Sequence, residues 1–505
     1  MKTFNYIILL CTVFLISCDQ EEFLTKTNKN GLNSETFMQT ESQAVKAVNA
    51  IYDPLNHKGL YKYGFMVMGE GPTDNVINPF ADGRTGPDVK ALHEYIWNDT
   101  NQFFLLRWNG CYKGIYRANF VLENLDMVNN ISSEKYNELK GQALFLRALF
   151  YFNLVSGFGD VPLVTSVLTS DESNNISKSP EATIWTQIDS DLDMAGTLLP
   201  ASYTTAETGR ATKGAAYGLL SRVRLWTKDF AGAASAAAEL DNLNYQLVPI
   251  ADYIKMFDGR MENSSESIFE TQLVSGFKNY WHHENAESTE LMSIFPRISW
   301  AQYLRPRQTD TYDIVNIFEA NDGRREGSIL ISGLDQIYYH ETDVVSVFPD
   351  TNIYSDWRLD VLTPGAYQTR KFLPYDITNW TRGGAFFDKG ATINIPVIRY
   401  SEVILNRAEA LAEDNKLTEA WTQLERIRDR AGLSMTGVSN SDKMALLMQI
   451  KNDRRIELLF EGHRWGDLKR WGELSSLSTA GLNYSGQTTW PIPSQEKSIN
   501  PNLSK

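Results

Sequence analysis

The sequence has few cysteines, no long internal apolar run and none of the common catalytic motifs. Three cysteines in 505 residues exclude a scaffold built on many disulfide bonds. Beyond the N-terminus, no apolar segment reaches the roughly 20 residues that a membrane-spanning helix needs. A G-x-S-x-G turn, an H-E-x-x-H pair and a phosphate-binding loop are absent, and the only adjacent histidines are His282 and His283. We therefore expect no metal ion, no cofactor and no catalytic centre.

Basic residues are outnumbered by acidic ones. The 48 Lys and Arg residues against 62 Asp and Glu residues give a formal net charge of −14. This balance disfavours nucleic acids and anionic lipid surfaces as partners. A glycosidase would need two carboxylates at a defined separation, and so many acids could supply a pair by chance. A glycosidase is therefore a distant alternative.

The N-terminus has the pattern of a bacterial lipoprotein signal. Lys2 precedes a short apolar run, and the run ends in the four residues Leu15 to Cys18. The run is too short to cross a membrane, so we expect residues 1–17 to be removed and Cys18 to carry the lipid. The alternative is an ordinary secretory peptide with an incidental cysteine. Residues 18–33 are polar and predict a flexible tether. Cys111 is the remaining cysteine of the mature chain, and we expect it to be a buried, inert thiol.

Helical periodicity dominates both ends of the region from 34 to 505, which we interpret as one domain. Ser34 is a plausible cap for the first helix. Apolar residues at helical spacing predict further helices over 104–128, 133–155, 181–199 and 442–460.

Two runs in this region share one pattern. The runs that begin at Phe230 and Leu417 repeat the same apolar offsets, and each follows a helical stretch across a three-residue turn. Small residues stand twelve positions apart in both, at Ser221 with Ala233 and at Ala408 with Ala420. Such spacing lets paired helices approach closely. We therefore predict a mainly α-helical, tetratricopeptide-like scaffold of about four helix pairs, with helical repeats over 34–245 and 396–505.

The middle of the chain, residues 246–395, has a different composition. It carries four tryptophans among Gly, Pro, Asn and Asp, without a sustained helical period, and residues 69–101 have the same character. Long irregular segments in a compact protein are usually functional or disordered, and this aromatic content argues against disorder. We expect residues 246–395 to form the ligand-binding face.

Motifs spread over nearly the whole chain resemble those of one family. In chain order they are residues 108–119, 143–148, 157–163, 318–324, 399–410, 454–472, 490–493 and 500–503. Together they resemble the SusD/RagB family of outer-membrane nutrient-binding lipoproteins. The resemblance implies the helical scaffold, an irregular ligand face and a partner, a SusC-like TonB-dependent transporter. It also implies an outer-membrane location, and the acidic residues directly after Cys18 are similar to an export signal to the cell exterior.

The block from Arg454 to Trp471 invites a catalytic interpretation because it places Arg, Glu and Asp around a glycine. Its spacing instead puts Ile456, Leu459 and Phe460 on one helical face and leaves charged residues to pair with neighbouring helices. A structural ion-pair network is the interpretation we favour. The same structural role is expected for Trp108, Arg147, Asp160, Arg399 and Trp471.

The candidate ligand-binding residues fall into two groups. Glycan binding needs flat aromatic faces with amide, carboxylate or guanidinium groups nearby, and five residues in the irregular region have this setting: Trp281, Trp300, Tyr303, Trp380 and Arg382. The second group lies in and after a Pro-Thr-Asp turn and comprises Asp74, Asn75, Asn78 and Arg84. Turn chemistry is an equal alternative for the second group, because Asp and Asn bond their own backbone in turns.

These patterns together predict a surface lipoprotein that binds an oligosaccharide or polysaccharide and delivers it to a transporter. One alternative is a peptide-binding protein on the same scaffold. Another is an assembly scaffold that binds only protein.

Overall fold

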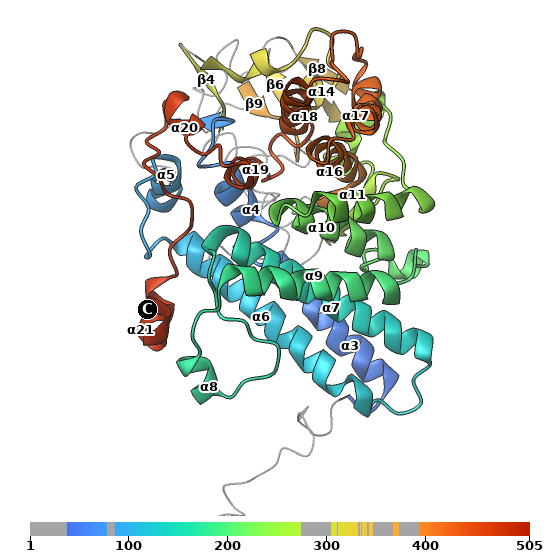
Figure 1. Cartoon of the computed structure of the whole chain (residues 1–505), viewed down its shortest axis with the longest axis vertical. Coiled ribbons are helices and arrows are strands. Elements are labelled where there is room, and N and C mark those ends of the chain that lie inside the picture. The colour runs from blue at the N-terminus through green and yellow to red at the C-terminus, as the bar shows by residue number, and fades with distance from the viewer. Residues whose placement is uncertain are drawn as a thin grey trace, which may run out of the picture.

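The computed structural model describes residues 38–77, 86–273, 305–310, 312–331, 334, 336–340, 343–346, 367–372 and 393–505. It is mostly helical (Figure 1). Its α-helices are α3 (Glu41–Tyr52), α4 (Tyr63–Gly69), α5 (Pro87–His93), α6 (Gln102–Asn124), α7 (Ser133–Phe158), α8 (Ser170–Asn175), α9 (Glu181–Leu198), α10 (Lys213–Trp226), α11 (Phe230–Ala238), α14 (Arg324–Ser328), α16 (Tyr400–Glu413), α17 (Leu417–Ala431), α18 (Lys443–Glu457), α19 (Arg464–Trp471), α20 (Ser476–Thr479) and α21 (Ser494–Ile499).

Short 3₁₀ helices connect or end several of these elements. They are η1 (Asp53–Asn56), η2 (Leu125–Met127), η3 (Thr205–Glu207), η4 (Glu239–Asn242), η5 (Ile250–Met256), η6 (Ile314–Ile317) and η9 (Pro501–Ser504). Within the described ranges, no helix is both long enough and apolar enough to cross a membrane.

The long helices pack in succession, as the helical-repeat prediction requires. Helix α3 contacts α6, α6 contacts α7, α7 contacts α9, and the series continues through α10, α11 and α16 to α17 and α18 (Figure 1). The predicted small residues Ser221, Ala233, Ala408 and Ala420 are all fully buried. The turns before α11 and α17 each contain one left-handed residue, Lys228 and Asn415, with φ 62° in both. The two repeats therefore share their packing and their turn geometry, and the predicted mainly helical fold is confirmed.

Several predicted helix boundaries are displaced. Helix α6 ends at Asn124 and not at 128, and α7 continues to Phe158, three residues beyond the predicted end. The first helix is capped by Thr40, whose hydroxyl accepts from the amide of Gln43, while Ser34 lies outside the described residues. Helix α18 ends at Glu457 and does not continue to residue 460. The reason is the left-handed backbone of Phe460, with φ 63°, which no α-helix accommodates.

The strands are short and form two-stranded antiparallel pairs in the part of the chain that the structure describes. The pairs are β1 (Val76–Ile77) with β3 (Arg305–Pro306), β2 (Ser267–Thr271) with β10 (Ile395–Arg399), β4 (Gln308–Thr309) with β5 (Tyr312–Asp313), β6 (Ile329–Ile331) with β9 (Tyr367–Thr369) and β7 (Gln336–His340) with β8 (Asp343–Ser346). All except β1 and β10 fall within the segment predicted to be irregular. Strands β4, β6, β8 and β9 gather at one end of the molecule (Figure 1), whereas Phe269 of β2 packs on Tyr52 and Phe145 of the helical part. The strands therefore lie beside the helical scaffold and do not form one large sheet.

The predicted buried state of Cys111 is confirmed. Its side chain is fully buried in α6, and burial raises the pKa of its thiol to about 12. Such a thiol stays protonated near neutral pH and is a poor nucleophile. Cys18, residues 1–17 and the predicted tether 18–33 lie outside the described residues.

Candidate functional site

The predicted Pro-Thr-Asp turn lies between α4 and β1 and is held tightly from three sides. Tyr95 donates its hydroxyl to the carbonyl of Pro72 at 2.6 Å, and Thr73 donates its hydroxyl to the carbonyl of Glu70 at 2.7 Å. Gly69, just before the turn, packs backbone to backbone on Gly462, where a Cβ atom would lie 2.2 Å from the Gly462 carbonyl oxygen. The turn is therefore fixed against the segment that links α18 to α19.

Asp74 faces inward and is ion-paired to two arginines. Its Oδ1 accepts from Nε of Arg464 at 2.9 Å, and its Oδ2 lies 2.9 Å from Nη2 of Arg455. Burial alone raises the pKa of the Asp74 carboxyl, but the two guanidinium groups outweigh burial and lower it to about 2. The side chain is 7% exposed. In this structure the carboxylate secures the turn.

Both polar side-chain atoms of Asn75 also hydrogen-bond to other residues of the protein. Its Oδ1 accepts from Nε of Arg455 at 2.8 Å, and its Nδ2 donates to Oε2 of Glu70 at 2.9 Å. The other Glu70 oxygen accepts from the amide of Gly462 at 3.0 Å. Burial raises the pKa of Glu70 to about 7, against the effect of these hydrogen bonds. The geometry thus gives Asp74 and Asn75 the turn-holding role, and their contact with a ligand remains a prediction.

The remaining predicted ligand residues lie outside the described residues. They are Asn78, Arg84, Trp281, Trp300, Tyr303, Trp380 and Arg382. Their described neighbours in the chain nevertheless meet: Ile77 is the register partner of Arg305 in the β1–β3 pair, and β3 also contacts β9. Strands β1, β3 and β9, which adjoin the segments that carry these predicted residues, therefore lie close together.

An aromatic cluster lies directly against the turn. The rings of Tyr95 and Trp97 are 4.6 Å apart, and Tyr484 meets Tyr95 edge-on at 5.4 Å. Trp97 and Tyr484 are half-buried. Ile96, which lies between Tyr95 and Trp97 in the chain, is 63% exposed. Trp97 also packs edge-on against Phe104 of α6. The cluster thus combines fixed rings with partly open faces.

Tyr312 contacts Arg455, the same arginine that holds Asp74 and Asn75. It is half-buried, and its hydroxyl accepts from Nη2 of Arg455 at 2.7 Å. Sequence reasoning missed both Tyr312 and Tyr484. The available signal was an aromatic residue in a short polar segment, and that signal is common in folded proteins. Tyr484 is distinguished from other tyrosines only by its contact with Tyr95, and Tyr312 only by its contact with Arg455.

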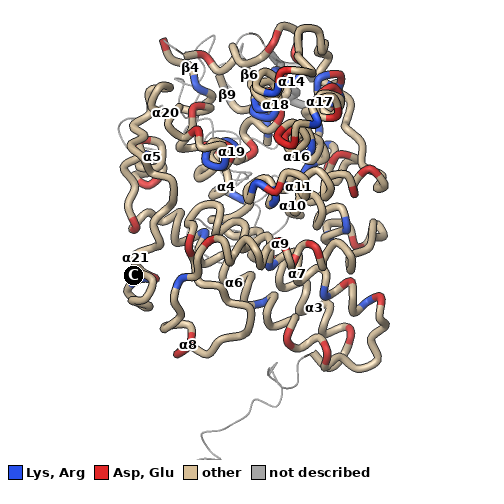
Figure 2. Tube along the Cα trace, viewed as in Figure 1, with Lys and Arg blue, Asp and Glu red and all other residues tan. Residues whose placement is uncertain are grey.

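The Arg454 to Trp471 block is a structural ion-pair network. Arg454 is 1% exposed, donates from Nε to Asp467 at 2.9 Å and from Nη1 to Asn406 at 2.7 Å. Glu457 is fully buried between Arg399 and Arg430. Figure 2 shows the corresponding mixture of basic and acidic positions around α16, α18 and α19. The predicted scaffold role of the block is therefore confirmed by its contacts.

The other residues predicted to be structural have such contacts as well. Arg147 donates to Asp191 at 2.7 Å and to Asn119 at 3.0 Å, and Asp160 accepts from the first amide of α9 at 2.8 Å. The indole of Trp471 donates to Glu409 at 2.8 Å, and Trp108 is buried. Each of these side chains joins elements of the scaffold.

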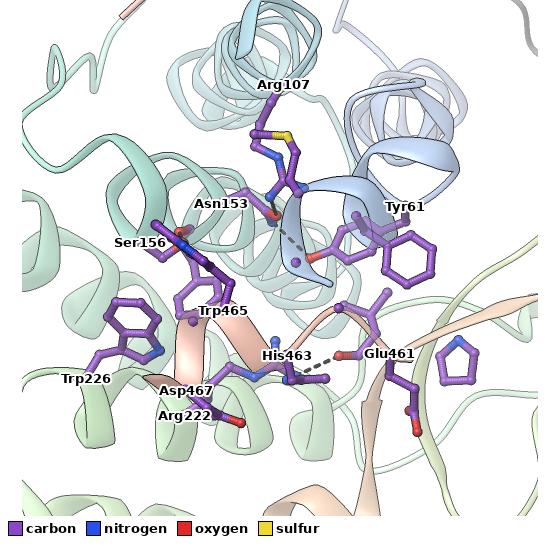
Figure 3. Close-up of a pocket in the computed structure, with 18 of the residues that line it drawn as sticks. Tyr61, Arg107, Asn153, Ser156, Arg222, Trp226, Glu461, His463, Trp465 and Asp467 are labelled. Carbon is purple, nitrogen blue, oxygen red and sulfur yellow. Dashed lines mark hydrogen bonds between the residues drawn. The ribbon is translucent and has the colours of Figure 1, made fainter. Parts of the chain in front are cut away.

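A cavity of about 100 Å³ lies behind the turn, between α6, α7, α10 and α19 (Figure 3). Charged and aromatic side chains line it together, among them Arg107, Arg222, Trp226, His463, Trp465 and Trp490. Burial lowers the pKa of His463 to about 4, so the ring is neutral at pH 7. Within the described part of the chain, no group of three His, Cys, Asp or Glu residues could hold a metal ion.

Comparisons with known proteins agree with this geometry. A family profile described as starch-binding associating with outer membrane matches residues 22–225, and the profile of the SusD family matches residues 250–505. A SusD-like protein of Formosa agariphila is 26% identical over 100% of this chain and 98% of its own length. A second SusD-like protein of that organism is 27% identical over 93% of this chain and 91% of its own length.

Solved structures have the same fold. A SusD superfamily protein from Bacteroides vulgatus has a TM-score of 0.74 at 25% identity, covering 92% of this chain and 98% of its own. A structure described as a laminarin binding SusD-like protein has a TM-score of 0.72 at 25% identity, covering 92% and 98%. Surface glycan-binding protein A from Bacteroides thetaiotaomicron, in complex with laminarihexaose, has a TM-score of 0.74 at 19% identity, covering 92% and 99%.

Proposed function

Because this chain belongs to the SusD family, we propose that it is a non-catalytic, lipid-anchored protein that binds an oligosaccharide or polysaccharide and passes it to a SusC-like TonB-dependent transporter. The name of the laminarin-binding relative supports carbohydrate as the ligand class. The family profile over residues 22–225 supports association with the outer membrane. Cys18 would carry the lipid, and the ligand face would point away from the cell.

The observation that carries the proposal is the aromatic cluster in which Trp97 and Tyr484, both half-buried, pack on the buried ring of Tyr95. Sugars present flat C–H faces that stack on aromatic rings, and rings that are already fixed lose little conformational freedom on binding. The cluster adjoins the turn whose strand, β1, leads into Asn78 and pairs with the strand that follows Tyr303. We therefore place the ligand face over β1, β3 and this cluster. Trp281, Trp300, Tyr303, Trp380, Arg382, Asn78 and Arg84 are the proposed contacts on the segments that extend from it.

A protein that delivers a glycan to a transporter must bind the glycan and also release it readily. Individual stacking contacts are weak, and tethering the protein beside the transporter raises the effective concentration of the captured glycan there. The buried ion pairs of Asp74 with Arg455 and Arg464 keep the turn rigid in this scheme. No step of covalent chemistry is involved.

Native electrophoresis through gels cast with single polysaccharides tests the proposal. The protein would be the mature chain with Cys18→Ser, and laminarin would be the first polysaccharide. We expect retardation by at least one polysaccharide, lost in a Trp281→Ala, Trp300→Ala, Trp380→Ala variant. The matched control is Tyr116→Ala, whose ring is 54% exposed on α6, and retardation should be retained.

Two results would contradict the proposal. Absence of retardation across a broad panel, with folding verified by circular dichroism, would shift the ligand class to peptides or leave a protein-only scaffold. Release of new reducing ends from the polysaccharide would show that the protein is an enzyme.

A further inference from the structure

Arg107 is a buried cation without a carboxylate partner. Its side chain lies in α6 with 7% exposure. Nε donates to the carbonyl of Gly59 at 3.1 Å and Nη1 donates to Oδ1 of Asn153 at 3.0 Å, so both acceptors are neutral. Among the described residues, no acid forms an ion pair with it. Burial lowers the pKa of its guanidinium, and no carboxylate counters this effect.

Comparable buried arginines in this protein are neutralised. Arg147 lies 2.7 Å from Asp191, Arg222 lies 2.6 Å from Glu402, and Arg324 lies 2.7 Å from Asp322. An isolated buried charge costs several kcal/mol or more unless a charge of opposite sign accompanies it. Among the described residues, Arg107 has no such partner, and neither has Arg307, which donates to the carbonyl of Ala480. A counter-charge for Arg107 would have to come from a bound ion.

The cavity behind the turn offers the place for that counter-charge. Arg107 points into it from above in the view of Figure 3, and its Nη2 has no hydrogen-bond partner in the described part of the chain. Trp490 also lines the cavity; it is 5% exposed, its Nε1 has no acceptor, and its ring lies 5.4 Å from the Arg107 guanidinium. Buried polar groups in native proteins are almost always hydrogen-bonded, to protein, water or an ion. Nε1 of Trp465, which also lines the cavity, has no acceptor either, so three donors of the lining are without a described partner.

Among the arginines that line the cavity, only Arg107 has no ion pair in the described part of the chain, since Arg222 pairs with Glu402 and Arg454 with Asp467. The lining includes three cations, Arg107, Arg222 and Arg454, and two anions, Glu461 and Asp467. Both anions are already paired, Glu461 with Lys371 and Arg399 and Asp467 with Arg454 and Arg470. A volume of about 100 Å³ is sufficient for one small ion together with several waters.

We propose that this cavity binds a small monovalent anion of about the size of chloride, held by Nη2 of Arg107 and Nε1 of Trp490. The anion neutralises Arg107 and completes the core beneath the 70–77 turn. It is a structural ligand and is separate from the proposed glycan contacts. The inference goes beyond the proposed function and stands or falls independently of it.

Bromide is the probe, because it replaces chloride and scatters X-rays anomalously. Crystals of the mature chain with Cys18→Ser, grown in bromide, should give an anomalous peak in the cavity within hydrogen-bonding reach of Arg107 Nη2. The Trp490→Phe variant keeps the stacked ring and removes only the N–H, and its peak should be weaker. Arg107→Met, which removes the charge and keeps the length of the side chain, should give no peak.

Thermal unfolding gives a second readout in solution. A ligand that binds only the folded state raises the unfolding midpoint, so the midpoint should be higher in sodium chloride than in sodium gluconate at equal ionic strength. The difference should persist in the control variant Arg407→Met, whose guanidinium is 22% exposed and paired with Asp241. It should be smaller in Trp490→Phe.

A cavity that contains only water would overturn the proposal. The signs would be no anomalous peak in the wild-type crystal and equal midpoints in the two salts. Both measurements use the wild-type protein, so the proposal stays testable even if Arg107→Met does not fold.

Discussion

Replacing Asp74 by asparagine tests whether the ion pairs beneath the ligand face stabilise the fold. The change keeps the shape of the side chain and removes the charge that Arg455 and Arg464 share. A pKa lowered from 3.8 to about 2 corresponds to about 2 kcal/mol of stabilisation by the ionised carboxylate. We therefore expect Asp74→Asn to lower the free energy of unfolding by about that amount at pH 7.

The pH dependence gives the prediction its sign. Because the pKa of Asp74 is lower in the folded state than in the unfolded state, the stabilisation is complete above about pH 5 and is lost as the pH falls toward 2. The difference between wild type and variant should shrink to roughly half at pH 3. Urea unfolding followed by circular dichroism at pH 7, 5, 4 and 3 measures it. Asp193→Asn is the control, since that carboxylate is 65% exposed and its loss should cost less than about 0.5 kcal/mol.

Equal stability of wild type and Asp74→Asn at pH 7 would refute the reasoning. It would mean that the cost of burying the three charges cancels their attraction. A difference that stays constant down to pH 3 would also contradict it, because the effect would then come from packing and not from charge.

Three further outcomes are expected. Gly69→Ala should destabilise the protein by about 1–3 kcal/mol in urea unfolding, since the new Cβ would meet the Gly462 carbonyl at 2.2 Å and neither backbone can yield; wild-type stability would contradict this packing. Arg399→Met should cost about 3–5 kcal/mol, because it leaves Glu266, Glu457 and Glu461 buried with one cation fewer, and a loss below about 1 kcal/mol would argue against the network. Tyr484→Ala should weaken retardation in a polysaccharide gel without lowering the unfolding midpoint, since its ring is partly exposed; unchanged retardation would remove Tyr484 from the ligand face.

The helical part of the fold could be predicted because its signals are local. Apolar residues at helical spacing define α6, α7 and α9 within a few residues, and small residues twelve positions apart predict the close pairs α10–α11 and α16–α17. The end of α18 could not be predicted, because the apolar pattern continues through Phe460 although its backbone has become left-handed. Periodicity reports which face is buried, and it does not report a change of backbone conformation.

The candidate site was less predictable. The sequence predicts candidate ligand residues in and after the 70–77 turn, but it does not predict the orientation of the turn's side chains. Asp74 meets Arg464, 390 positions later, and Asn75 meets Arg455, 380 positions later. These pairs form only when the two ends of the scaffold pack together.

The sequence by itself therefore determined the long helices, their pairing and the buried state of Cys111, because each depends on the spacing of neighbouring residues. The tertiary structure alone decided that Asp74 and Asn75 face inward, that Tyr484 packs on Tyr95 and Tyr312 meets Arg455, and that Arg107 has no carboxylate partner among the described residues. The physical reason is that charge pairing and stacking depend on distances in space between residues far apart in the chain, and local sequence patterns carry no record of those distances.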